Sequence, residues 1–351
     1  MNSSDVQPLV EVTRGPVVES IHFGTIVISD TTGRVVAAVG NPQTVTYLRS
    51  SAKPFQILPF VEQGGLEHFG LTDRELAVMC ASHHGTDEHV RVIRALQAKI
   101  GVSEADLLCG IHPPEDKATT LRMVANHEAN SSLRHNCSGK HSGMLAFCKL
   151  RGWPTQDYIY PLHPLQQTIF QTFCELCGVP LSQLKLGTDG CSAPVFAVPM
   201  QAAARAFALI ADPSALPEPR AASLHHIFAA VTANPDMIAA PGALDTELML
   251  ACAGKVLVKS GAEGYLAMAL LPGACGAGSP AYGITIKVSD GDQFEERARA
   301  TIAVEVLRQL GALPADAAAY LSAFDRRPQY NWRHMEVGEI RPVFKLPLRQ
   351  P

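Results

Sequence analysis

The chain has 351 residues, of which 47% are hydrophobic and 18% charged, a balance typical of a globular protein with a sizeable core. A net charge of −4 without basic runs argues against nucleic-acid binding. The first ten residues lack the apolar core of a signal peptide, and no stretch reaches the roughly 18 apolar residues of a membrane helix. Nine cysteines without a disulfide-type spacing fit a reducing compartment, so we expect a cytoplasmic protein without nucleic-acid or membrane partners.

The first elements predicted along the chain form an antiparallel hairpin. Two runs rich in β-branched residues, 24–30 and 34–40, are separated by a short turn that ends in Gly33. A helix is expected to follow from Ser50. Its first turn contains Pro54, where a missing amide donor is tolerated, and it should end at Gly64.

The middle of the chain is predicted to be mainly helical. Helices are expected at 74–80, 86–100, 144–151, 163–177, 199–210, 219–233 and 244–253. The segment 109–117 is expected to be a loop, and the polar cluster 136–143 should open the helix at 144. The pair Cys174 and Cys177 has the spacing of half a zinc site, but no second pair follows, so core packing is the better interpretation.

Strands return toward the end of the chain. They are expected at 255–259, 265–271, 282–288 and 337–344, with a short one at 184–186 and helices at 292–310 and 315–324. Strands at both ends and helices between them predict an α+β fold, with the N- and C-terminal strands side by side in one antiparallel sheet. We expect a single catalytic chain with a sheet lobe (1–65 plus 254–351) and a mainly helical lobe (66–253).

Ser50 and Lys53 form the first candidate catalytic pair. Positions i and i+3 share one face of a helix, and the positive end of the helix dipole disfavours an ammonium. We therefore expect Lys53 to be partly neutral and able to take the hydroxyl proton of Ser50. The same spacing recurs at Ser182 and Lys185 without a helix start, so spacing alone does not identify a catalytic serine.

Two further blocks follow the Ser50–Lys53 pair along the chain, in an order that is found in a known class of enzymes. Ser82 lies in a polar loop after an apolar helix, and Lys259-Ser260-Gly261 is expected on a strand. In this order the blocks resemble the S-x-x-K, S-D-N and K-T-G motifs of serine β-lactamases and penicillin-binding proteins. The second block departs from that pattern because His84 stands where an asparagine is expected. A serine acyl-transfer enzyme with that fold is one interpretation.

A more specific resemblance covers nearly the whole chain. Five blocks resemble, in order, the rhizobial-type (asparaginase II) family of L-asparaginases: 49–56, 80–83, 136–143, 189–191 and 259–264. The resemblance implies hydrolysis of L-asparagine to L-aspartate and ammonia, a serine β-lactamase-like fold and a homodimer.

The resemblance also implies roles for individual residues. The family's two serine–lysine tandems map onto Ser50 with Lys53 and onto Ser82 with Lys259. Its zinc site, made of two cysteines and a lysine, maps onto Cys137, Lys140 and Cys191, so we expect one Zn²⁺ per chain. The alternative is that these cysteines are buried thiols and the lysine a solvated cation.

The polar ends of the substrate require further partners. Arg49 is a candidate for the carboxylate, with a structural ion pair as the alternative, and Asp189 or Glu263 is a candidate for the ammonium group. His83 is a candidate substrate-binding residue within its block. A hydrogen-bonded structural histidine is an equally open interpretation for it, and also for His84 and His141.

Three other functions compete with asparagine hydrolysis. A peptidase or β-lactamase of the same fold would act outside the cytoplasm, and no export signal is present. A glutaminase differs by one substrate methylene, which a pocket distinguishes by only about 1–3 kcal/mol. A non-enzymatic zinc-bound amino-acid sensor is disfavoured because both serine–lysine pairs are retained.

Overall fold

The computed structural model describes residues 3–292 and 297–348. The chain divides into two compact units, which are described separately. The first comprises Met1–Ser51, Val198–Asp212 and Glu247–Pro351, and the second comprises Ala52–Ala197 and Pro213–Thr246. These boundaries are not those of the expected lobes, and the division into those two lobes stays a prediction.

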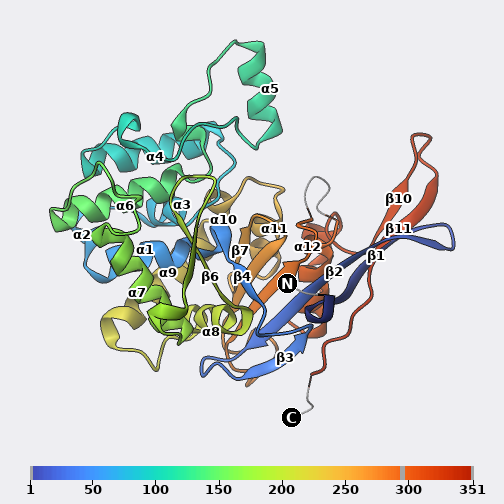
Figure 1. The fold of residues 1–351 in the computed structure, drawn as a ribbon. Helices are drawn as coiled ribbons and strands as arrows, with labels where there is room; N and C mark the ends of the chain where they lie inside the picture. Colours follow the sequence, from blue (N-terminus) through green and yellow to red (C-terminus); the bar gives the residue numbers. More distant parts are fainter. Residues whose placement is uncertain (1–2, 293–296, 349–351) are drawn as a thin grey trace. The chain divides into compact units, whose positions relative to one another are not determined.

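An antiparallel sheet organises the first unit (Figure 1). Within the described residues eight strands join in the order β10-β11-β1-β2-β9-β8-β7, with β3 paired to β2. They are β1 (Gln7–Arg14), β2 (Val17–Ser29), β3 (Val35–Val39), β7 (Val256–Gly261), β8 (Tyr265–Leu270), β9 (Tyr282–Val288), β10 (Arg327–Tyr330) and β11 (Glu336–Pro342). Because β1 pairs with β11, the two ends of the chain lie side by side as predicted. The predicted α+β class and the β2–β3 hairpin are confirmed.

Helix α8 (Met200–Ala211) lies directly against the sheet of the first unit. A Cβ at Gly283 of β9 would lie 1.8 Å from the Ala204 carbonyl oxygen, so a larger residue there would push the helix away. Val27 and Met200 are fully buried at this contact. The other elements that fall wholly or mostly in this unit are η1 (Ser3–Asp5), β4 (Val45–Tyr47), η2 (Arg49–Ala52), α11 (Leu244–Ala251), α12 (Arg299–Gln309) and α13 (Ala318–Leu321).

The second unit is mainly helical. Its helices are α1 (Lys53–Glu62), α2 (Gly65–Phe69), α3 (Asp73–Met79), α4 (Asp87–Ile100), α5 (Lys117–Ala125), α6 (Ser138–Arg151), α7 (Pro164–Cys177), α9 (Glu218–Ala233) and α10 (Pro235–Ile238), with short turns η3 (Glu104–Asp106), η4 (Ser132–Arg134) and η5 (Leu181–Gln183). Strands β5 (Lys185–Thr188) and β6 (Pro194–Pro199) pair antiparallel. Helix α1 packs against α6, α7 and α9, and its Phe55 ring lies 5.5 Å from that of Phe173.

The predicted helix starts agree with the structure where a cap is present. Thr72 and Thr86 cap α3 and α4, and each forms a capping box with the third residue of its helix. Gly101 ends α4 in the left-handed conformation that favours glycine. Of the helices in the described residues, none is long and apolar enough to cross a bilayer.

Several boundaries differ from the predicted ones. Helix α6 begins at Ser138 rather than at 144, because Gly139 and Gly143 permit close packing inside the helix instead of interrupting it. Helix α1 begins at Lys53, after the 3₁₀ turn η2, rather than at Ser50. The sequence did not predict β1, β4, β6, β10, α2, α5 or α10. In the helix predicted over 292–310, residues 293–296 lie outside the described residues.

Candidate active site

Ser50 lies in η2, immediately before α1. Pro54 occupies the first turn of α1, as predicted, where the amide hydrogen that proline lacks would have no partner within the helix. The neighbouring Ser51 is fully buried, and its hydroxyl donates to the Lys259 carbonyl oxygen at 2.6 Å. This bond ties the Ser50 turn to strand β7 within the first unit.

Gly261 explains why β7 can approach that turn. A Cβ at this position would lie 2.5 Å from the Leu48 carbonyl oxygen and 3.2 Å from the Ser51 hydroxyl. Only glycine allows the strand to lie so close to the serine turn. The Lys-Ser-Gly block therefore has a packing function in addition to supplying Lys259.

Lys259 is buried in β7, and its ammonium nitrogen lies 2.8 Å from the Ser260 carbonyl oxygen. The other two candidates of the first unit lie in turns. Arg49 is half-buried, and Glu263 is exposed in the β7–β8 turn, where its backbone φ is 60°. The Glu263 carbonyl oxygen accepts a hydrogen bond from Lys287 at 2.6 Å, which fixes this turn.

Lys53 is the most constrained candidate of the second unit. Its side chain is only 1% exposed, and its nitrogen lies 2.6 Å from the Ala81 carbonyl oxygen and 3.1 Å from that of Asn136. The third neighbour is the Ser82 hydroxyl at 2.9 Å. The Lys53 nitrogen donates to all three oxygens, and of these only the Ser82 hydroxyl carries a proton that it could give in return. Ser82 is therefore the neighbour with which Lys53 can exchange a proton.

His83 is held by the protein on both sides of its ring. Its Nδ1 accepts from the Gly85 amide at 3.1 Å, so its Nε2 carries the proton and donates to the Ser138 hydroxyl at 2.9 Å. The hydroxyl of Ser138 in turn donates to the Leu133 carbonyl oxygen. Burial lowers the pKa of His83 well below its ordinary value, so the ring is neutral. This geometry favours a positioning role for His83 over direct contact with a substrate.

Cys137, Lys140 and Cys191 lie together in the second unit, as the sequence resemblance implies. Cys137 precedes α6, Lys140 lies in its first turn, and the Lys140 nitrogen is 2.9 Å from the Cys191 sulfur. All three side chains are buried. The hydrogen bond between the sulfurs holds the pKa of Cys137 well below its ordinary value and raises that of Cys191. Burial lowers the pKa of Lys140, but the two sulfurs outweigh burial and raise it.

This donor set suits a zinc ion. Two sulfurs and one amine nitrogen converge in a buried site, which are ligand types that zinc accepts, and a tetrahedral ion would keep its fourth position open. In the described part of the chain, no cluster of three histidine, cysteine or acidic side chains could hold a metal. The set of Cys137, Lys140 and Cys191 is the candidate that the sequence resemblance implies. Asp189 lies beside it, with its Oδ2 3.9 Å from the Cys191 sulfur.

Sequence reasoning missed the residues that hold these groups in place. His135 accepts from the Cys137 amide through Nδ1 at 3.0 Å, and Ser138 links α6 to the Ser82 loop. His141, left open as structural or functional, lies 2.6 Å from the Tyr158 hydroxyl, and His84 lies 3.8 Å from Glu115. Isolated residues of these types have no sequence signal. The clustering of polar residues in 136–143 was the only available indication.

The sequence matches the family model described as L-asparaginase II over residues 10–342. The chain belongs to this family. As a member it is an amidohydrolase, and the predicted family assignment is confirmed.

Two other comparisons add little to the family assignment. A solved structure of the Bacillus subtilis glutaminase YbgJ, in covalent complex with 5-oxo-L-norleucine, matches with 10% identity. The match covers 76% of this chain and 80% of the glutaminase, with a TM-score of 0.35. At this TM-score we draw no conclusion from the likeness. A comparison with curated proteins found no match.

Proposed function

We propose that this member of the family is an L-asparaginase that hydrolyses L-asparagine to L-aspartate and ammonia through an acyl-enzyme on Ser50. The observation that carries the proposal is the bonding of Lys53. Its buried nitrogen donates to two carbonyl oxygens and to the Ser82 hydroxyl, and this hydroxyl is the one of the three partners that can also give a proton. This contact supports proton transfer between Lys53 and Ser82, and transfer of the Ser50 proton to this pair is part of the proposal.

The proposed reaction has two steps. The Ser50 oxygen attacks the carbonyl carbon of the substrate's side-chain amide, and its proton passes to Lys53, or to Lys259 through Ser82. The carbon–nitrogen bond then breaks, and the amide nitrogen takes up that proton and leaves as ammonia. In the second step a water molecule attacks the ester, its proton returns through the lysine to Ser50, and aspartate is released.

The remaining predicted residues would orient the substrate. Arg49 would bind the α-carboxylate, and Asp189 or Glu263 would bind the α-ammonium group. Backbone amides in the Ser50 turn are candidates for stabilising the oxyanion. Through its interactions with Gly85 and Ser138, His83 would hold the Ser82 loop in place.

We also propose that Cys137, Lys140 and Cys191 hold one Zn²⁺. When bound, the ion would supply a buried positive charge with one open position for a polar group of an amino acid. A homodimer and a cytoplasmic location complete the proposal. Light scattering of the purified chain tests the dimer, and a monomeric mass at assay concentration would contradict it.

The function is tested by measuring ammonia release from asparagine and glutamine in parallel, with wild type, Ser50→Ala and Ser182→Ala. The last variant is a matched control, because Ser182 has the same spacing to a lysine but lies exposed in η5. We expect faster release from asparagine, none in Ser50→Ala and unchanged release in Ser182→Ala. Faster release from glutamine would identify a glutaminase. Tight binding of either amino acid without turnover would identify a sensor.

A further inference from the structure

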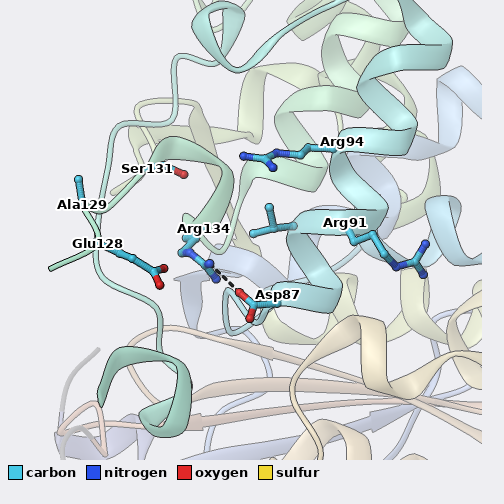
Figure 2. Close-up of a pocket in the computed structure, with 8 residues that line it drawn as sticks. Asp87, Arg91, Arg94, Glu128, Ala129, Ser131 and Arg134 are labelled. Carbon is cyan, nitrogen blue, oxygen red and sulfur yellow. Dashed lines mark hydrogen bonds and ion pairs between the residues drawn. The ribbon is translucent and has the colours of Figure 1, made fainter. Parts of the chain in front are cut away.

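A pocket of about 430 Å³ lies in the second unit, between α4 and the segment that follows α5 (Figure 2). It is lined by Asp87, Val90, Arg91, Arg94, Glu128, Ala129, Ser131 and Arg134. None of these residues belongs to the predicted catalytic or metal-binding sets. Its volume lies within the range of small-molecule sites.

Arg94 and Arg134 form the cationic side of this pocket. Arg134 is fixed, because it is 13% exposed and donates to the Gly85 carbonyl oxygen and to Asp87, both at 2.7 Å. Arg94 has no hydrogen-bond or ion-pair partner within the described part of the chain. Figure 2 shows its guanidinium directed toward the segment that carries Ser131. An unpaired guanidinium presents a planar fork that matches a carboxylate.

Asp87 and Glu128 form the anionic side. Both of the arginine bonds to Asp87, from Arg122 and Arg134, end on its Oδ1. Both bonds to Glu128, from Arg122 and Asn126, end on its Oε1. The second oxygen of each carboxylate accepts no hydrogen bond from the described residues, so it is available to an ammonium group.

We propose that this pocket binds a free α-amino acid as its zwitterion. Arg94 binds the carboxylate, with the Ser131 hydroxyl as a second donor, and Glu128 and Asp87 bind the ammonium group. Inorganic phosphate is a poor occupant, since its second charge meets the two carboxylates. A simple cation is equally unsuitable, because the guanidinium groups of Arg94 and Arg134 line the same pocket.

Arg134 links this pocket to the predicted catalytic loop. Its guanidinium holds the Gly85 carbonyl, three residues after Ser82, and its own position is three residues before Cys137. An amino acid whose ammonium group binds Asp87 therefore acts on both segments through the ion pair between Asp87 and Arg134. Any effect on turnover rests on the proposed function, whereas binding in the pocket does not.

Calorimetric titration of the full chain with L-alanine tests the proposal. This probe has both backbone charges but no side-chain amide or carboxylate. We expect Arg94→Gln to weaken binding about tenfold or more, the effect of losing a charged hydrogen bond. The matched control is Arg91→Gln, since Arg91 points away from the pocket and pairs with Glu88 at 2.7 Å. We expect this control to bind as tightly as wild type.

Glu128→Gln separates a zwitterion site from an anion site. We expect this variant to bind L-alanine more weakly than wild type and acetate no more weakly. Wild-type affinity in Arg94→Gln, equal weakening in both arginine variants, or phosphate binding as tight as that of L-alanine would each overturn the proposal. Arg94 is exposed and makes no hydrogen bond or ion pair with the described residues, so its variant should fold normally. Activity in Ser50→Ala would overturn the nucleophile without affecting these results.

Discussion

Replacing Gly139 by alanine tests how closely α6 packs against the segment that leads to Ser82. A Cβ at Gly139 would lie 2.1 Å from the Val78 carbonyl oxygen, so an ordinary contact of 3.4 Å requires a shift of about 1.3 Å. Overpacking of this kind costs about 1–3 kcal/mol, and alanine recovers about 1 kcal/mol of helix propensity. We expect the free energy of unfolding to fall by up to about 2 kcal/mol. A displacement of about 1 Å near Ser82 should also lower kcat/KM on the order of 100-fold.

Urea unfolding followed by circular dichroism measures the stability change, and ammonia release from asparagine measures the change in kcat/KM. Gly190→Ala is a control for stability, because its Cβ would have no heavy atom within 4 Å. We expect the unfolding free energy of this control to stay within about 0.5 kcal/mol of wild type. If Gly139→Ala were as stable and as active as wild type, the close packing of α6 against Val78 would be refuted.

Three further predictions concern single groups. Lys53→Met should lower kcat by about 10²–10⁴-fold in the ammonia assay, and normal turnover would show that Lys53 is not the base. Elemental analysis should find about one zinc per wild-type chain and almost none in Cys137→Ser, whereas equal zinc in both would contradict the proposed ligands. Burial lowers the pKa of His89 to about 4 in the folded protein. As the pH falls below the ordinary value of 6.5, the unfolded state therefore takes up a proton before the folded state does, which favours unfolding. The free energy of unfolding should therefore fall by about 3 kcal/mol between pH 6.5 and 4. Urea unfolding at a series of pH values should show that the free energy of unfolding of His89→Gln depends less on pH than that of wild type. An equal pH dependence in both would contradict the prediction.

Elements with local signals were predictable from the sequence. Thr72 and Thr86 satisfy amide groups within their own helices, and Gly101 adopts a conformation that few other residues tolerate. Strand β1 has no such signal, because Pro8 and a register shift interrupt its pattern. Its partner β11 lies at the opposite end of the chain, so the strand is defined by long-range pairing that sequence periodicity does not reveal.

The sequence predicted which residues form the candidate site, but it did not predict the backbone groups and close contacts that hold them in position. The serine, lysine and cysteine positions follow from the motif blocks. The partners of Lys53 are mainly backbone carbonyls, whose positions depend on packing and not on side-chain identity. Gly139 shows the same limit: glycines normally disfavour a helix, yet here close contact with Val78 requires one inside α6.

The central claim is that Ser50 carries the acyl group, and mass spectrometry of protein quenched during asparagine turnover tests it most directly. We predict that the peptide containing Ser50 gains the mass of an aspartyl group, and that Ser50→Ala shows no adduct on any peptide. An aspartyl adduct on Ser82 in place of Ser50, or turnover in Ser50→Ala at the wild-type rate, would contradict the claim.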